Sequence, residues 1–409
     1  MIEGAVESGA ESAAAGSVAE SVGDGANPLR ELVGRRAYWV WSATAQLCRA
    51  PVLMAAMAFS GLMLVTGGRP EDGGVLVASL VLAQVFVAGA AGRVFDRRPG
   101  RVLPAVATGV AAVALGLVAV TGVSGAPLWA SCLCAAVAGV ALAGLPGLAR
   151  DRLNVAVPRR LVEPALAVDA TVVELLVVGA PLVVSAVLLI GAAGGVVAMA
   201  VTAAAAGALL ALGPRAARPV TAEGTAGGVL WSPAFLAWLA VSFAFGHALG
   251  AIETAALTLA GTLDAGVFGG GAIIAILSVA GIASGLGYAA LGGKLPGGPR
   301  ARAAVLLLVV AAATVAVGRA GSWPTLAVAV VLVGLGAAPL NAIRSYAVEQ
   351  LVPDSRRTEG FSWLYTANGL GFAVSGLGLS WLPLWLALAV PAASCVAGVL
   401  LLGATRGRT

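Results

Sequence analysis

Four ionisable side chains interrupt otherwise apolar stretches of this chain, and their types suit proton chemistry. They are Arg49, Glu174, His247 and Glu253. A charge at the centre of a membrane-spanning helix costs about 2.5–3.5 kcal/mol, so each of these residues needs a partner, water or a function. Carboxylates and imidazole can exchange protons near neutral pH in such surroundings. The four residues are therefore candidates for proton coupling.

Arg49 and Glu174 are predicted to lie at the same depth. Each lies about eight to ten residues into an apolar run, which corresponds to ~12–15 Å along a helix. Asp169 and Arg344 fall near the ends of their apolar runs, so we expect them to be solvated or to reach the interface.

The other reactive residue types form no catalytic or metal-binding pattern. The cysteines occur singly, without a CxxC pair, at Cys48, Cys132, Cys134 and Cys395, and are expected to be buried hydrophobic residues. His247 is the only histidine and has no second metal ligand nearby, and Lys294 does not complete a phosphate-binding loop. We therefore expect no enzyme, no cofactor, no metal site and no ATP-driven mechanism.

Membrane-spanning helices must position these residues. The chain has 409 residues, of which 60% are hydrophobic and 11% charged, whereas soluble proteins carry about 25% charged residues. A helix needs about 20 apolar residues to cross a hydrocarbon core. Runs of this kind lie at 39–65, 73–92, 102–123, 127–148, 166–189, 193–212, 231–255, 267–290, 303–319, 323–344, 361–381 and 384–403.

The chain also divides into segments of different composition. We predict a disordered cytoplasmic tail over 1–36, a six-helix bundle over 37–212, a polar Pro/Gly-rich linker over 213–228 and a second bundle over 229–409. Several starts of the first six runs recur in the last six at an offset of roughly 190–200 residues. Two bundles related in this way suit alternating access around a site at mid-membrane.

The basic residues fall on one side of the predicted helices. With the N-terminus in the cytoplasm, all but Arg49, Arg69 and Arg319 of the 24 basic residues lie in cytoplasmic segments. Such asymmetry is the positive-inside rule. We therefore expect a multi-pass protein of the cell membrane with both termini in the cytoplasm. The net charge of +5 then reflects topology rather than nucleic-acid binding.

The segment that joins the second and third runs reads Gly92-Arg-Val-Phe-Asp96-Arg-Arg-Pro99-Gly100-Arg101. It resembles the G-x-x-x-D-R-x-G-R loop of the major facilitator superfamily, with Pro99 inserted. The resemblance implies an all-α membrane protein with twelve transmembrane helices in two pseudo-symmetric six-helix bundles. It also implies that this loop latches the two bundles together in the outward-facing state.

In this latch, Gly92 would let two helices approach closely, and Asp96 would bind backbone amides at the start of the eleventh helix, near Thr358 and Glu359. The matching loop of the second half, residues 292–302, lacks an acidic residue. The latch residues implied by the resemblance are Gly92, Asp96, Arg97, Gly100 and Arg101.

Further stretches look like bacterial members of the superfamily described as exporters. They include Arg49-Ala-Pro51, Glu174 with Gly179 and Pro181, and the run from Thr358 to Trp363. Proton antiporters of the superfamily bend the fifth helix at a Gly-Pro motif, a role that would fall to Gly179 and Pro181. The first and fifth helices are neighbours in the superfamily, so the resemblance also implies an Arg49–Glu174 pair. The pair could be a permanent buried salt bridge, or Glu174 could exchange its contact with Arg49 for a proton during transport. Helices 1, 4, 7 and 10 line the pathway in the superfamily and supply the substrate-cavity candidates Gln46, Ser131, His247 and Asn341. Tyr365 and Asn368 on the eleventh helix are second candidates, and the deeper Trp238 and Trp363 could contact an aromatic substrate.

These features predict a secondary transporter that exports small, largely apolar drugs or metabolites by proton antiport. Glu174 would favour cations, whereas an unpaired Arg49 would favour anions. An importer or uniporter of metabolites such as sugars is the alternative, although sugar sites need many hydrogen-bonding side chains and these helices offer few. A non-transporting membrane sensor or lipid-handling protein is the alternative from another class. The expected partners are a small-molecule substrate, protons and the lipid bilayer, and we expect a monomer.

Overall fold

A computed structural model describes residues 28–67, 70–213, 229–264, 266–291 and 294–405 of the chain. Within these ranges the regular secondary structure is helical. The long helices are α3 (Arg36–Val65), α4 (Pro70–Arg97), α5 (Val102–Val123), α6 (Leu128–Leu142), α9 (Val162–Leu188), α10 (Gly194–Leu212), α11 (Pro233–Thr262), α12 (Gly266–Leu291), α13 (Pro299–Val317), α14 (Trp323–Leu351), α15 (Arg357–Trp381) and α16 (Leu384–Ala404).

The helices match the predicted membrane spans. Among the described residues, eleven helical segments are long and apolar enough to cross a membrane. The remaining predicted span coincides with α15, which has 25 residues and packs along α11 and α4. Polar residues such as Thr366 and Asn368 make α15 less apolar than its neighbours.

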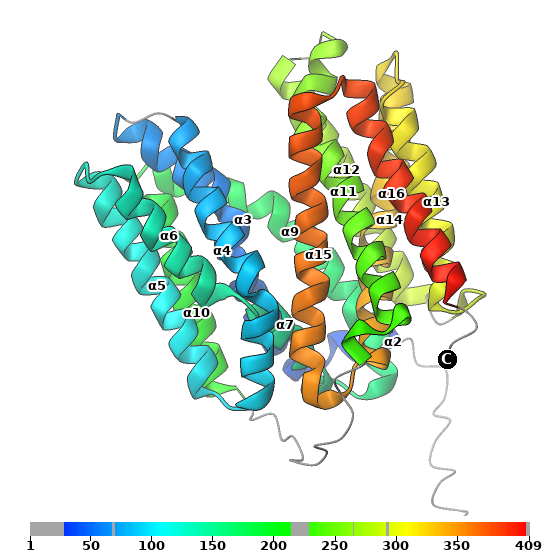
Figure 1. Ribbon diagram of the computed structural model, residues 1–409, viewed down its shortest axis with the longest axis horizontal. Coiled ribbons are helices and arrows are strands. Elements are labelled where there is room, and N and C mark those ends of the chain that lie inside the picture. The colour runs from blue at the N-terminus through cyan, green and yellow to red at the C-terminus, as the bar shows by residue number, and fades with distance from the viewer. Residues whose placement is uncertain (1–27, 68–69, 214–228, 265, 292–293, 406–409) are drawn as a thin grey trace, which may run out of the picture.

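The helices form two groups, which converge at one end of the molecule and spread apart toward the other (Figure 1). One group contains α3 to α6, the short helix α7 (Leu145–Asp151), α9 and α10, and the other contains α11 to α16, with α9 at the boundary between them. The groups meet where α9 packs on α12 and α14, and where α4 and α7 pack on α15. We call the end at which α4 ends and α15 begins the joined end. The predicted domain limits stay a prediction, because residues 1–27 and 214–228 lie outside the described ranges.

A glycine breaks the fourth predicted span, which was expected to run over 127–148. Helix α6 ends at Leu142, and Gly144 adopts a positive φ of 75°, which favours glycine because it has no side chain. A Cβ on Gly144 would also lie 2.9 Å from the backbone nitrogen of Gly92. The chain then re-enters helix as α7, which carries Arg150 into the interior, where its side chain is 1% exposed.

Part of the predicted N-terminal tail is folded. Residues Pro28–Val33 form the short helix α2, in which Leu32 is fully buried. Glu31 binds Arg35 at 2.7 Å and Arg160 at 2.6 Å. Hydrogen bonding from Arg35, supported by Arg160, lowers the pKa of the Glu31 carboxyl. The prediction of disorder is therefore wrong for Pro28–Val33, where an apolar contact and ion pairs anchor a helical turn.

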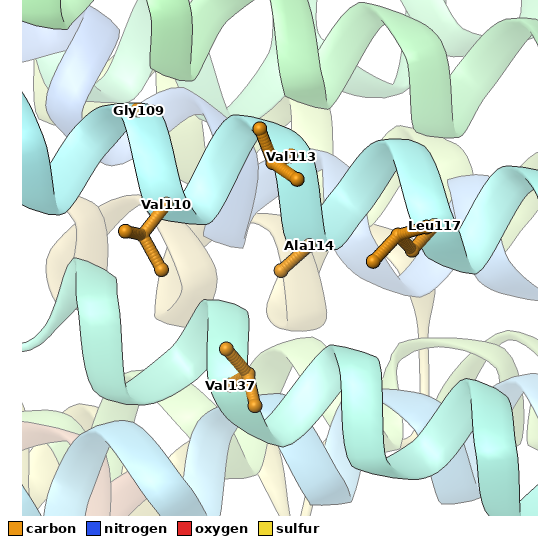
Figure 2. Close-up of a pocket in the computed structure, with 6 residues that line it drawn as sticks. All are labelled: Gly109, Val110, Val113, Ala114, Leu117 and Val137. Atoms are coloured by element: carbon orange, nitrogen blue, oxygen red, sulfur yellow. The ribbon is translucent and has the colours of Figure 1, made fainter.

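A shallow groove of about 340 Å³ lies between α5 and α6 (Figure 2). It is lined by Gly109, Val110, Val113, Ala114, Leu117 and Val137. An apolar groove on the surface of a membrane-spanning bundle suits a lipid acyl chain, and its lining offers no group that could do chemistry.

Candidate functional site

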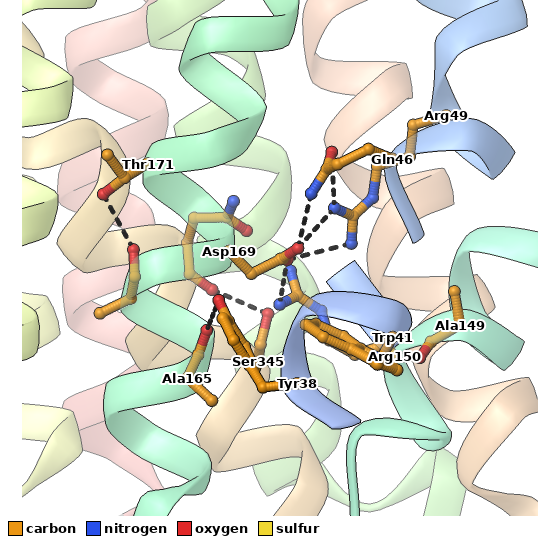
Figure 3. Close-up of polar contacts among 12 residues, drawn as sticks. Tyr38, Trp41, Gln46, Arg49, Ala149, Arg150, Ala165, Asp169, Thr171 and Ser345 are labelled. Atoms are coloured by element: carbon orange, nitrogen blue, oxygen red, sulfur yellow. Dashed lines mark hydrogen bonds and ion pairs between the residues drawn. The ribbon is translucent and has the colours of Figure 1, made fainter. Parts of the chain in front are cut away.

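A group of buried polar side chains gathers around Asp169 of α9, which is fully buried (Figure 3). Arg49 of α3 donates to both of its carboxylate oxygens, with Nη1 2.9 Å from Oδ1 and Nη2 3.1 Å from Oδ2. Arg150 of α7 places its Nη1 2.7 Å from Oδ2, and Gln46 donates to Oδ1 at 2.8 Å. One carboxylate therefore holds two guanidinium groups from different helices.

The predicted Arg49–Glu174 pair is wrong, because Arg49 binds Asp169 instead. Asp169 and Glu174 are five residues apart on α9, which separates them by about 140° around the helix. Asp169 faces α3, whereas the Glu174 side chain lies beside Gly281 of α12, where a Cβ would be 3.3 Å from its Cδ. The expectation that Asp169 is solvated is also wrong, since α9 begins at Val162 and places Asp169 well inside the bundle.

Side chains from the second helix group complete the arrangement. The Tyr365 hydroxyl accepts hydrogen bonds from Arg150 Nε at 3.1 Å and from Arg49 Nη2 at 3.3 Å. Next to it, Arg344 of α14 is 3% exposed and donates to Asn368 at 2.9 Å and to Asn341 at 3.0 Å. Arg344 also donates to Ser242 of α11.

We call this set the central cluster, and it draws on both helix groups. Its members are Gln46, Arg49, Arg150, Asp169, Ser242, Asn341, Arg344, Tyr365 and Asn368. Five of them were named from the sequence as pathway or coupling residues. The other four are Arg150, Asp169, Ser242 and Arg344. Arg344 was expected near the interface, but α14 continues to Leu351 and keeps it buried.

The other predicted cavity residues lie elsewhere. Ser131 shares a hydrogen bond of 2.8 Å with Thr121 between α6 and α5. Trp238 belongs to the packed apolar core and is 2% exposed. Trp363 packs against Gly89 of α4, where a Cβ would be 2.6 Å from its Cε2.

Arg49 lies in the central cluster, and the other three proton-coupling candidates lie in two further places. His247 makes a 3.0 Å hydrogen bond with Ser394 of α16, within the second helix group. Glu174 of α9 and Glu253 of α11 are half-buried and close enough to interact electrostatically. In the described part of the chain, neither carboxyl has a hydrogen-bond or ion-pair partner. A role in proton coupling stays a prediction for Arg49, Glu174, His247 and Glu253.

The contact predicted for Asp96 is present at the joined end. Its Oδ1 accepts from Thr358 N at 3.1 Å and its Oδ2 from Glu359 N at 2.8 Å, so a carboxylate caps the N-terminus of α15. Glu359 in turn binds Arg93 of α4 at 2.8 Å. Gly92 allows this approach, since a Cβ there would be 2.7 Å from Ser362 Oγ and 2.9 Å from Thr358 O.

The other implied latch and bend residues are placed as follows. Arg97 is exposed, Arg101 is half-buried, and the Gly100 carbonyl accepts from Arg152 at 3.0 Å. Gly179 and Pro181 fall within α9, which continues to Leu188, so a bend of this helix stays a prediction.

A second polar contact joins the two helix groups where the matching loop lacks an acid. Glu163, near the start of α9, accepts from Tyr288 of α12 at 2.7 Å and from Arg302 of α13 at 3.2 Å. The acid thus comes from α9 of the first helix group, whereas the matching loop belongs to the second group. Both ends of this ion pair are partly exposed, so it contributes less than the buried Asp96 contact.

A bulky side chain at Gly92 should separate α4 from α15. We expect Gly92→Leu to break the Asp96 contacts, because its Cβ already conflicts with backbone atoms of Thr358 and Glu359. The substitution should make the joined end accessible to a membrane-impermeant thiol reagent at a cysteine introduced for Ser362, which is 2% exposed. Gly100→Leu is the matched control, because a Cβ at Gly100 meets nothing within 4 Å. Equal labelling of the two variants would contradict this account of Gly92.

Comparison with known proteins identifies the fold. No family model and no curated protein sequence matches the chain. Among solved structures, the chain is similar to the human organic anion transporter MFSD10 (TM-score 0.72, 14% identity, 90% of this chain and 99% of that one). It is also similar to the proton:xylose symporter XylE (0.73, 13%, 91% and 96%) and to FucP of E. coli in the outward conformation (0.69, 13%, 91% and 100%). The chain therefore has the major facilitator superfamily fold, as predicted.

Proposed function

We propose that this protein is a secondary active transporter that moves small organic molecules across a membrane by alternating access. The observation that carries the proposal is the position of the central cluster. Its charged side chains come from both helix groups, and the groups are held together at the joined end by Asp96 and Glu163. A substrate bound between two bundles that rock against each other would be exposed to one side at a time.

The joined end is assigned to the cytoplasm, because the positive-inside rule places the termini and the Arg-rich loops there. With this end closed, the central cluster would be reached from the outside. FucP is a fucose:proton symporter and XylE is a proton:xylose symporter. The fold alone therefore does not determine the substrate.

For direction and coupling we propose export by proton antiport. Glu174 and Glu253 support this part, because two neighbouring carboxyls without ion-pair partners among the described residues are suited to take up and release protons. Glu174 of α9 lies beside Gly281 of α12, where the two helix groups meet, and is close enough to Glu253 of α11 to interact electrostatically. Protonation of this pair would remove charge from the interface and so make one arrangement of the bundles more favourable.

Everted membrane vesicles provide the test. We would measure accumulation of a cation (ethidium), an anion (1-naphthoate) and a neutral compound (1-naphthamide), with and without an imposed pH gradient. Antiport predicts gradient-dependent accumulation of at least one probe that vesicles lacking the protein do not show. Movement of none of the three probes would contradict the proposed function.

Glu174→Gln is expected to abolish the part of transport that depends on the pH gradient, because glutamine cannot release a proton. Expression and thermal stability should change little, since Glu174 has no partner to lose among the described residues. Glu31→Gln on the peripheral helix α2 serves as the matched control and should transport normally. Gradient-driven transport at the wild-type rate by Glu174→Gln would rule out this residue as the coupling group.

A further inference from the structure

The central cluster carries more positive than negative charge. Arg49, Arg150 and Arg344 are 8%, 1% and 3% exposed, and Asp169 is the acid among them. Counted formally, one of the three guanidinium charges is neutralised and two are not. Such charges are unfavourable in the interior of a membrane protein unless a counter-charge or water reaches them. This imbalance indicates that an anion belongs in the cluster.

Arg344 shows the imbalance most directly. Its partners are the neutral groups of Ser242, Asn341 and Asn368, and its guanidinium carbon lies 4.7 Å from the ring centroid of Phe245. Its Nε is buried and has no hydrogen-bond partner among the described residues. These contacts fix the orientation of the guanidinium but leave its charge without a counter-ion in the part of the chain that the structure describes.

Arg150 is the neighbour of Arg344 from the opposite helix group. The two are close enough to repel each other electrostatically, although Asp169 already holds Arg150 Nη1. Arg150 Nη2 is buried without a hydrogen-bond partner. Two like charges with open donors, one from each helix group, can be bridged by a single carboxylate or phosphate group, which is the usual ligand of guanidinium pairs.

Nearby acids do not supply the missing charge. Glu349 lies farther along α14 toward the joined end, where it interacts with Arg357 and Asn154 and, less strongly, with Arg150. It is five residues from Arg344, which turns it about 140° around the helix. Asp151 follows Arg150 on α7 and also lies near Glu349. Arg344 is thus left as the buried cation whose partners are neutral.

We infer that the central cluster binds the anionic group of an organic anion, a carboxylate or a phosphate, between Arg150 and Arg344. The inference rests on the proposed transport function and names the substrate class for the same site. Phe245 and the surrounding apolar helices would receive the apolar body of the molecule. The negative charge of the anion would also reduce the repulsion between the two arginines. Since they come from different helix groups, binding would favour the arrangement in which the two groups lie close together.

The test measures binding to the purified full-length protein in detergent by thermal unfolding. The probes are 1-naphthoate, 1-naphthyl phosphate, neutral 1-naphthamide and sodium chloride, each over a concentration series. A ligand of the folded state raises Tm, and we expect an increase of about 2–4 °C from naphthoate, naphthyl phosphate or both. The two anions distinguish a carboxylate site from a phosphate site. Equal stabilisation by naphthamide, or by chloride alone, would overturn the inference.

Variants locate the site. Arg344→Gln should lose the anion-dependent shift, and Arg344→Lys should keep part of it, because lysine retains the charge without the planar fork. Arg319→Gln, at an exposed arginine, is the matched control and should keep the full shift. Should Arg344→Gln fail to fold, Arg344→Lys and the wild-type comparison of naphthoate with naphthamide still decide the question. An undiminished shift in both Arg344 variants would overturn the inference.

The vesicle assay separates this inference from the proposed function. Gradient-driven movement of ethidium or naphthamide, without binding or movement of the anions, would leave transport standing and remove the anion site. Binding of naphthoate that depends on Arg344, without movement of any probe, would leave the site standing and remove the transport function.

Discussion

Asp169→Asn is expected to lower the stability of the folded protein by about 3–5 kcal/mol and to abolish transport. The substitution leaves Arg49 and Arg150 buried without their shared carboxylate, and removing one partner of a buried ion pair has a cost of this size. Thermal unfolding in detergent, followed by the loss of monodisperse protein on size-exclusion chromatography, measures the effect.

The control is Asp264→Asn. Asp264 is exposed and has a positive φ of 54°, a conformation that asparagine also tolerates. The stability of the Asp264→Asn protein should therefore equal that of the wild type. The double variant Asp169→Asn/Arg49→Met should recover part of the lost stability, because it removes one of the uncompensated charges. An unchanged Tm for Asp169→Asn would contradict the role given to this carboxylate.

Asp96→Asn should have the second largest effect, and it should act on conformation. The Asp96 carboxylate accepts two backbone N–H groups at the start of α15, and charge-assisted hydrogen bonds of this kind contribute about 1.5–3 kcal/mol. A loss of about 2 kcal/mol shifts the equilibrium between the two bundle arrangements by roughly 30-fold. We expect faster alkylation of a cysteine at Ser362 and a lower transport rate at saturating substrate.

Arg98→Gln is the matched control for Asp96→Asn. Arg98 is exposed in the same loop, so its removal changes the local charge without touching the α15 cap. Alkylation of Asp96→Asn at the wild-type rate would show that this contact does not hold the joined end closed.

The Asp96 contact could be predicted from the sequence because a local motif determines it. Gly92 and Asp96 are four residues apart at the end of one helix, so they share a face, and the resemblance supplied the facing helix start. The twelve apolar runs were likewise predictable, since hydropathy directly reports which segments can be buried in lipid.

The partner of Arg49 could not be predicted, because it depends on where helices end and how they are rotated. Helix α14 continues to Leu351, past the predicted end at residue 344, and α9 begins four residues before its predicted start. Helices that extend beyond the hydrocarbon layer have polar ends, which a hydropathy run excludes. The hydropathy pattern therefore predicts Arg344 and Asp169 at the membrane interface, whereas both are buried in the structure.

Arg150 was missed for a different reason. The stretch on both sides of Gly144 is apolar, so α6 and α7 appear as one span, and only the positive φ of Gly144 reveals the change of direction. Glu163, which binds Tyr288 and Arg302 at the joined end, lies on a helix of the other group. The sequence of the loop over 292–302 therefore could not predict it.

The most direct test of the account is whether the two ends of the molecule open in alternation. Spin labels on Arg98 and Ser355 would report the joined end, and labels on Ser124 and Ser322 would report the opposite end, since all four residues are exposed. The four native cysteines would first be replaced. Pulsed dipolar spectroscopy of the wild type and of Asp96→Asn then gives both distances. Alternating access predicts that Asp96→Asn lengthens the Arg98–Ser355 distance and shortens the Ser124–Ser322 distance. Distances that change together, or that do not change, would contradict it.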